Sequence, residues 1–153
     1  MKKITFILII FLTLFSCSSK VVFEKEYEIK NNKWQAENVI NFKFKVEDNS
    51  LNYNMFFTMH NSKKYRTSNI WLYVITSSPS GKSVTDSLEY FLSDDKGVWR
   101  GQDNSDFIKN KFLYKSNIKF TENGEYNVSV TQGMREKDTP NIKTFGLVVE
   151  KTE

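Results

Sequence analysis

The sequence predicts an all-β protein: a single β-sandwich of about eight antiparallel strands, preceded by a lipoprotein signal peptide. Two observations carry the fold prediction. Apolar and polar residues alternate with a period of two along most of the chain, which is typical of half-buried strands. Turn-forming residues separate these stretches at fairly regular spacing, and no long stretch keeps a helical period. Both a jelly-roll-like and an immunoglobulin-like topology fit this pattern.

The start of the chain is typical of a bacterial lipoprotein signal. Lys2 and Lys3 are followed by an apolar run at 4–14 that is too short to cross a bilayer, and Ser16 precedes Cys17, the only cysteine. We expect cleavage after residue 16 and lipid attachment to Cys17; the alternative is an ordinary cleaved signal with an unrelated thiol. The predicted organisation is a signal peptide at 1–16, a lipidated cysteine and short tether at 17–22, and a β-sandwich domain at 23–153.

The charge distribution argues against a nucleic-acid partner. The formal net charge is +4, and the predicted signal accounts for part of it through its two lysines. The remaining basic and acidic residues are interleaved, with no basic cluster of the kind that phosphate backbones select. Glycine-rich phosphate loops are missing as well. We expect no nucleic acid, no metal and no cofactor.

The first half of the domain contains four predicted strands. Residues 21–29 alternate around a charged interruption, and residues 39–47 show the clearest half-buried pattern in the chain. Residues 53–59 repeat that pattern. Residues 70–75 are apolar at every position, which predicts a strand covered on both faces, with Trp71 in the core.

The second half continues in the same way. Residues 84–92 form a predicted strand between two turns, and the polar segment 101–110 is expected to be a loop or a short helical turn. Asn123-Gly124 lies between two apolar stretches and is the strongest short hairpin signal. The last strand is predicted at 145–149.

Candidate catalytic and metal-binding residues are few. His60 is the only histidine, so a Ser–His–acid or Cys–His arrangement would need it as its base. No nucleophile or zinc motif surrounds it, and we interpret it as a strand-end histidine facing water. The aspartates of residues 94–106 lack the spacing of a calcium loop and are interpreted as solvated turn residues.

Two segments, 99–106 and 132–135, are candidates for an interaction surface, because exposed Trp, Met and Arg are effective interface anchors. The candidate surface residues are Trp99, Arg100, Asp103, Asp106, Gln132, Met134 and Arg135. Gln132 and Arg135 are equally compatible with a buried polar network. Trp34 and Trp99, both next to polar loops, are also candidates for an aromatic platform that binds a glycan.

Several segments occur in a characteristic order along the chain. They are Thr67 to Val74, Gly81-Lys82-Ser83, Asp86 to Tyr90, Gly97-Val98-Trp99-Arg100-Gly101, Leu113-Tyr114-Lys115, Gly124-Glu125-Tyr126, Gln132-Gly133-Met134-Arg135 and Phe145-Gly146-Leu147. Together with Cys17, this ordered set resembles the gliding-motility lipoprotein family GldH. The sequence departs from the family at Lys64-Tyr65-Arg66, where a tyrosine-proline-tyrosine run is more usual, and at Val148, where a basic residue is common.

The resemblance implies a lipid-anchored, non-enzymatic envelope component that acts as a subunit or assembly factor of the gliding and secretion machinery. It implies the membrane and other envelope proteins of that machinery as partners, and it supplies no catalytic residues. Ser18-Ser19-Lys20 lacks the acidic residues that outward-facing lipoproteins of gliding bacteria often carry, so we expect an outer-membrane anchor facing the periplasm. The alternative is a glycan-binding β-sandwich module of the cell envelope.

Overall fold

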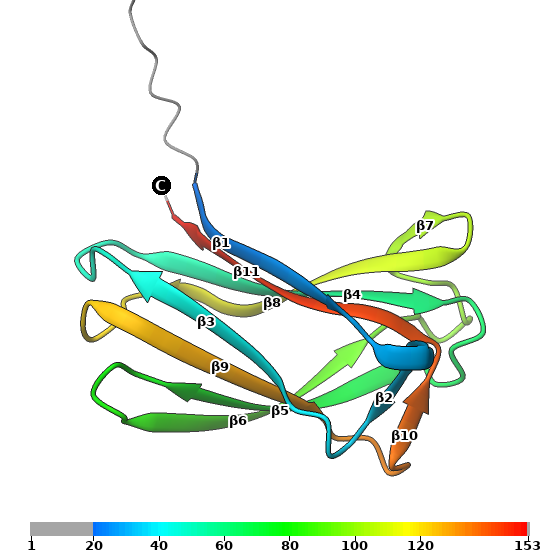
Figure 1. The fold of residues 1–153 in the computed structure, drawn as a ribbon. Helices are drawn as coiled ribbons and strands as arrows, with labels where there is room; N and C mark the ends of the chain where they lie inside the picture. Colours follow the sequence, from blue (N-terminus) through cyan, green and yellow to red (C-terminus); the bar gives the residue numbers. More distant parts are fainter. Residues whose placement is uncertain (1–19, 153) are drawn as a thin grey trace, which may run out of the picture.

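The computed structural model describes residues 20–152, which form two packed antiparallel sheets and a short two-stranded sheet at one end (Figure 1). The strands are β1 (Val21–Glu28), β2 (Lys33–Gln35), β3 (Ile40–Val46), β4 (Tyr53–Ser62), β5 (Asn69–Ser77), β6 (Ser83–Phe91), β7 (Gln102–Asn104), β8 (Phe107–Ile118), β9 (Gly124–Gln132), β10 (Asp138–Pro140) and β11 (Ile142–Lys151), and a single 3₁₀ turn, η1, spans Lys30–Asn32. The predicted β-sandwich is confirmed. β1 begins at Val21, two residues before the expected start of the domain.

The order of the strands identifies the topology. The first sheet has the order β1-β11-β4-β8-β7 and the second has the order β3-β9-β5-β6. The long strands therefore pair in a nested way, β1 with β11, β3 with β9, β4 with β8 and β5 with β6. A ribbon of nested antiparallel pairs rolled into two sheets is a jelly roll. Of the two topologies that the sequence allowed, the structure therefore has the jelly-roll arrangement.

The alternating pattern of the sequence explains β3 and β4. In β3 every second residue from Ile40 to Val46 is buried, while the lysines between them are exposed. In β4 every second residue from Tyr53 to Met59 is buried in the same way. Because successive side chains of a strand point to opposite faces, this places one apolar face of each sheet against the other. Both predicted strands are confirmed.

The core between the sheets is rich in aromatic rings. Phe145 lies at its centre, with ring centroids 4.8 Å from Trp34, 5.3 Å from Phe57 and 6.3 Å from Phe42. All four side chains are fully buried. Trp34 comes from the short strand β2, and its indole N–H donates to the Asn38 carbonyl at 2.9 Å, so it closes one end of the sandwich with its polar atom satisfied.

The strand that is covered on both faces is β11, not β5 as the sequence predicts. β11 runs between β1 and β4, and residues 144–149 are all buried. At Gly146 a Cβ atom would lie 2.8 Å from the Lys25 carbonyl oxygen, so only glycine fits between the neighbouring strands. In β5 every second residue faces outward instead, with Trp71 38%, Tyr73 50% and Ile75 43% exposed. The prediction that Trp71 lies in the core is therefore wrong.

Two further local predictions are wrong, because in both segments the pairing of strands decides the structure and the local composition does not reveal that pairing. Asn123-Gly124 does not form a hairpin between paired strands, since β8 belongs to the first sheet and β9 to the second. The polar segment 101–110 is not a loop or helical turn: it contains β7, a turn at 105–106 and the first residues of β8. Hydrogen bonding between β7 and β8 gives this polar segment its extended structure. The side chains of the segment do not alternate between apolar and polar, so the sequence alone does not predict a strand there.

A polar cluster links the two sheets where β6 faces β8. Asp86 on β6 accepts hydrogen bonds from the Tyr114 hydroxyl at 2.8 Å and from the Lys115 ammonium at 2.9 Å. Thr76 donates to the Tyr114 oxygen at 3.1 Å, since the only phenolic hydrogen is given to Asp86. Burial, in the main, raises the pKa of Tyr114 well above its ordinary value, so the phenol remains a donor. The cluster fixes the distance between the sheets at this open edge.

We predict that Asp86→Asn reduces the stability of the protein and flattens its dependence on pH in the acid range. Partial burial raises the pKa of Asp86, but the hydrogen bonds from Lys115 and Tyr114 outweigh it and leave the pKa below its ordinary value. The stabilisation is therefore present above about pH 4 and is lost as the pH falls through the lower folded-state value. The expected cost near neutrality is about 1 kcal/mol, measured by urea unfolding.

The matched control for this prediction is Asp95→Asn, which removes the same charge from an exposed turn. We expect the control to follow the wild type at every pH. If the unfolding midpoint of Asp86→Asn fell with decreasing pH as steeply as that of the wild type, the proposed role of the carboxylate would be wrong.

Candidate functional site

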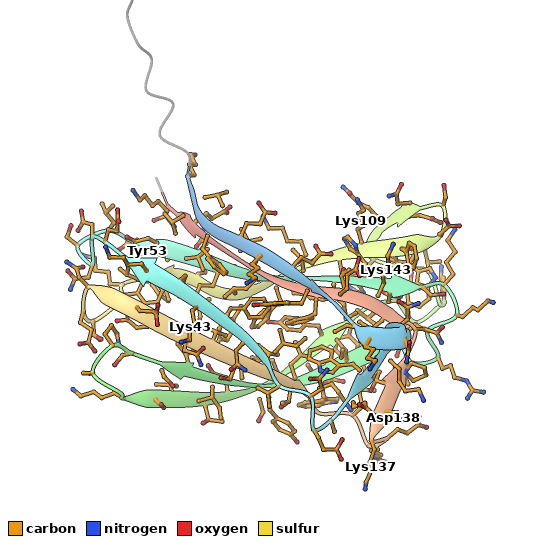
Figure 2. All side chains as sticks on the ribbon, in the orientation of Figure 1. Lys43, Tyr53, Lys109, Lys137, Asp138 and Lys143 are labelled. Carbon is orange, nitrogen blue, oxygen red and sulfur yellow. The ribbon has the colours of Figure 1, made fainter. Side chains whose placement is uncertain are left out.

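Two adjoining hollows lie at the end of the sandwich that carries β2 and β10. The first hollow has a volume of about 680 Å³ and is bounded by residues 65–69, the start of β5, residues 133–136 and β10. The second hollow, of about 620 Å³, is bounded by residues 65–68 and 91–100. Residues 65–67 belong to both. In Figure 1 β10 lies at the end opposite to the start of β1 and the C-terminus, and Figure 2 marks it by Lys137 and Asp138.

The first hollow lies where β5 loses one of its two neighbouring strands. β9 pairs with β5 only from Leu72 onward, so residues 69–71 are paired with β6 alone. Residues 133 and 134 approach this free edge. The Gly133 N–H donates to the Trp71 carbonyl at 2.7 Å, and the Trp71 N–H points to the Met134 sulfur at 3.3 Å. A thioether is a weak acceptor, so this N–H is poorly satisfied.

Gln132 holds the segment that borders this hollow. It is only 2% exposed, and its amide nitrogen donates to the carbonyls of Glu136 at 3.2 Å and Lys137 at 3.1 Å. Its amide oxygen accepts from the Met134 N–H at 2.7 Å. Gln132 therefore belongs to a buried polar network, while Arg135 is exposed. The buried polar network that the sequence offered for both residues therefore includes Gln132 but not Arg135.

The aromatic part of the first hollow comes from β5. Trp71 and Tyr73 occupy successive outward positions on this strand, and Gly133 packs against the Tyr73 ring, where a Cβ atom would lie 2.7 Å from Cε2. Trp34, one of the two candidates for an aromatic platform, is fully buried and does not contribute to it. The sequence hides this platform, because residues 70–75 of β5 are all apolar and the outward face of the strand cannot be recognised by polarity.

The second hollow contains Trp99 and Arg100. Trp99 is half-buried against the core, and the Arg100 Nε donates to the Ser93 carbonyl at 3.3 Å. Asp94 shapes the neighbouring turn, since its carboxylate accepts from the N–H groups of Lys96 and Val98, both at 2.9 Å.

The structure brings four of the seven candidate surface residues to the hollows: Trp99, Arg100, Met134 and Arg135. Gln132 is buried behind them. Asp103 forms an ion pair with Lys63 at 2.8 Å, and Asp106 is exposed. Neither aspartate borders a hollow. The sequence reasoning missed Arg66, which borders both hollows. A signal was available, because arginine is rare in this chain: the three arginines are Arg66, Arg100 and Arg135.

His60 lies on the first sheet, on β4, two residues before its end, rather than facing water at a strand end. Its Nδ1 is 3.4 Å from a Glu26 carboxylate oxygen. Partial burial lowers the pKa of His60 below its ordinary value. The negative charge of Glu26 opposes this decrease, whereas the positive charges of Lys109 and Lys143 add to it. Figure 2 shows both lysines above this sheet. None of these neighbours is a nucleophile of the Ser or Cys type.

Residues 20–152 contain no group of three or more His, Cys, Asp or Glu side chains that could hold a metal ion. Within the same residues no helix is long and apolar enough to cross a membrane.

Fold and site together define a single jelly-roll domain that presents a recess lined by aromatic rings and arginines at one end. A family model described as GldH lipoprotein matches residues 21–149. The chain belongs to this family of gliding-motility lipoproteins of the cell envelope, and the resemblance seen in the sequence is confirmed.

Two curated relatives support the assignment. The chain is 34% identical to a gliding motility lipoprotein GldH homolog of Christiangramia forsetii, over 97% of this chain and 95% of the relative. It is also 34% identical to the gliding motility lipoprotein GldH of Flavobacterium johnsoniae, over 80% of this chain and 76% of that protein.

Among solved structures, dimeric latent PorU from Porphyromonas gingivalis matches 89% of this chain with a TM-score of 0.38 and 11% identity, and this chain spans 14% of its length. The infectious bursal disease virus VP2 subviral particle matches 86% of this chain with a TM-score of 0.38 and 7% identity, over 30% of the viral chain. Both scores are too low to establish a common fold.

Proposed function

We propose that this protein is a lipid-anchored, non-enzymatic subunit or assembly factor of the gliding and secretion machinery, and that it binds a protein partner of the envelope through the two hollows. The observation that carries the proposal is the outward aromatic face of β5: Trp71 and Tyr73 are 38% and 50% exposed next to Met134 and the arginines. Large exposed aromatic side chains beside arginine are the usual anchors of protein interfaces.

The composition of the hollows favours binding over catalysis. Trp, Tyr, Met and Arg side chains line them together with small polar residues and the carboxylates of Asp94, Asp95 and Glu136, and among the described residues no histidine borders either hollow. The one histidine, His60, is on the first sheet, paired with Glu26, whereas the aromatic part of the recess belongs to the second sheet. A non-enzymatic role is therefore the function that these residues support best.

The proposed anchor lies outside the described residues, at Cys17. Because β1 already begins at Val21, only a few residues separate the proposed lipid from the sandwich. The hollows lie at the opposite end, and a strand of about nine residues is roughly 30 Å long. In this arrangement the domain stands on the membrane with its recess directed away from it. An outer-membrane anchor facing the periplasm remains our proposal for the location, on the basis of Ser18-Ser19-Lys20.

A glycan is the second candidate ligand, for one specific reason. Trp71 and Tyr73 are successive outward residues of one strand, so their rings are spaced by about 7 Å along it, and such a pair can stack on sugar rings. The glycan-binding alternative therefore applies to the same recess as the protein-binding proposal.

We predict that Trp71→Ala lowers the recovery of gliding and secretion proteins in a pull-down from envelope membranes by about tenfold or more, because truncating an interface anchor costs about 2 kcal/mol. Leu113→Ala is the matched control, since Leu113 is exposed like Trp71 (50% against 38%) but lies on β8 in the other sheet. The control should recover the same proteins as the wild type.

Two results would contradict the proposal. Equal recovery with Trp71→Ala and the wild type would exclude the β5 face as the interface. Recovery of polysaccharide alone, lost on Trp71→Ala, would replace the protein-binding proposal by the glycan-binding one.

A further inference from the structure

The arginines and lysines of this protein are used differently. The chain has only three arginines, and all three border the two adjoining hollows: Arg66, Arg100 and Arg135. The ion pairs found among the described residues use lysines, with His60 as the other cation. Since the guanidinium group is suited to bidentate binding of a carboxylate, its restriction to one region points to an anionic ligand there.

Arg66 and Arg135 both border the first hollow, and both are exposed. Neither makes an ion pair with a carboxylate of the described residues within 4 Å, although Glu136 also borders this hollow. The two guanidinium groups therefore keep their hydrogen-bond donors available, next to the aromatic floor formed by Trp71 and Tyr73.

The free edge of β5 adds a main-chain feature to the same hollow. Residues 69–71 have β6 on one side but no β9 partner on the other, and the Trp71 N–H is directed to the Met134 sulfur. A carbonyl oxygen of an extended peptide would be a better acceptor than this thioether. Met134 is a flexible side chain, so it can move aside when such a peptide enters.

The neighbouring polar side chains favour a peptide over a sugar. The Asn69 amide already donates to Glu89, and the Thr67 hydroxyl already donates to the Asn69 carbonyl at 3.0 Å. These groups are therefore engaged within the protein and are not available to several sugar hydroxyls at once. The Thr139 hydroxyl has no partner, but this residue is only 5% exposed. The donors that remain available are the two guanidinium groups and the Trp71 N–H, which suit carboxylates and a peptide backbone, beside apolar rings that suit an apolar side chain.

We propose that the first hollow binds an extended segment of a partner protein in which a carboxylate lies next to an aromatic or aliphatic side chain. The carboxylate binds Arg66 and Arg135, the apolar side chain packs on Trp71 and Tyr73, and a backbone carbonyl of the segment accepts the hydrogen bond of the Trp71 N–H. This inference rests on the proposed function, because it names the chemistry of the protein partner.

The test uses the full chain, purified in detergent, and two short fluorescent peptides. One alternates aspartate with phenylalanine, and the other has asparagine in place of every aspartate. We expect the acidic peptide to bind, and the amide peptide to bind about tenfold more weakly or worse, because hydrogen bonds to charged groups are lost. Arg66→Gln and Arg135→Gln should each weaken the acidic peptide by about tenfold.

Three further variants separate the contributions of the planar guanidinium group and of the backbone contact from that of simple charge. Lys119→Gln removes one positive charge from an exposed residue away from both hollows, and it should leave binding within about twofold of the wild type. Arg135→Lys keeps the charge but loses the planar fork, and it should still weaken binding. Met134→Leu removes the sulfur acceptor and should leave binding equal or tighter.

Three results would each overturn the inference. The two peptides could bind equally well, or the acidic peptide could fail to bind. Lys119→Gln could also weaken binding as much as Arg66→Gln does. The envelope pull-down distinguishes this failure from failure of the proposed function. If Arg66→Gln together with Arg135→Gln still recovered the wild-type partners, the peptide chemistry would be wrong while the protein-binding role stood. If the wild type recovered no envelope protein, the proposed function itself would fail.

Discussion

Replacing Phe145 by alanine should lower the free energy of unfolding by about 3–5 kcal/mol, the largest loss that we expect from a single substitution in this protein. Phe145 is fully buried on β11, and its ring contacts those of Trp34, Phe57 and Phe42. The truncation removes apolar burial and leaves a cavity that neighbouring rings cannot close, because β11 is held between β1 and β4. Urea unfolding, followed by tryptophan fluorescence, measures the loss, since the buried Trp34 becomes exposed when the protein unfolds.

The control for this prediction is Phe91→Ala, the same change at a residue that is 56% exposed. We expect it to cost less than about 1 kcal/mol, because surface substitutions leave no cavity. A loss at Phe145 as small as that at Phe91 would show that the core around β11 repacks, and the central position assigned to this ring would be wrong.

The sequence predicted the sandwich because local alternation reports which face of a strand is buried. β3 is the clearest case, since its lysines and phenylalanines alternate without exception. Alternation does not report which strand lies beside which. The Asn123-Gly124 hairpin failed for this reason: the turn chemistry was read correctly as a turn, but the two strands joined by it belong to opposite sheets. The jelly-roll topology is determined by the pairing of strands that lie far apart in the sequence, and a single sequence does not show which strands pair.

The candidate site was predicted in part, for a similar reason. Trp99, Arg100, Met134 and Arg135 were chosen as residue types that anchor interfaces, and all four border the hollows. The sequence predicts Trp71 in the core because residues 70–75 of β5 are apolar, as are residues 145–149 of β11. In β11 the residues on both faces are buried, whereas the outer face of β5 is exposed. Composition does not distinguish these two cases.

The functional prediction with the largest expected effect concerns the anchor. A form exported by an ordinary cleavable signal in place of residues 1–17, and therefore without Cys17, should move from the membrane pellet to the soluble envelope fraction and should abolish gliding. One acyl chain binds a bilayer only marginally, whereas two or more hold a protein stably at about 0.8 kcal/mol per buried CH₂. Fractionation followed by immunoblotting measures the first effect, and colony spreading measures the second.

Anchoring and recognition should be separable, since they belong to opposite ends of the molecule. In detergent extracts the unanchored form should still recover the partner, because the recess is unchanged, whereas Trp71→Ala should fail to recover it even though it remains in the membrane. The loss of gliding without the lipid would then reflect the lower local concentration of the domain at the membrane surface rather than a weaker contact. Normal spreading by cells that contain only the soluble form, at wild-type abundance, would show that the lipid is dispensable. Loss of partner recovery by that form in detergent would instead place part of the interface in the tether.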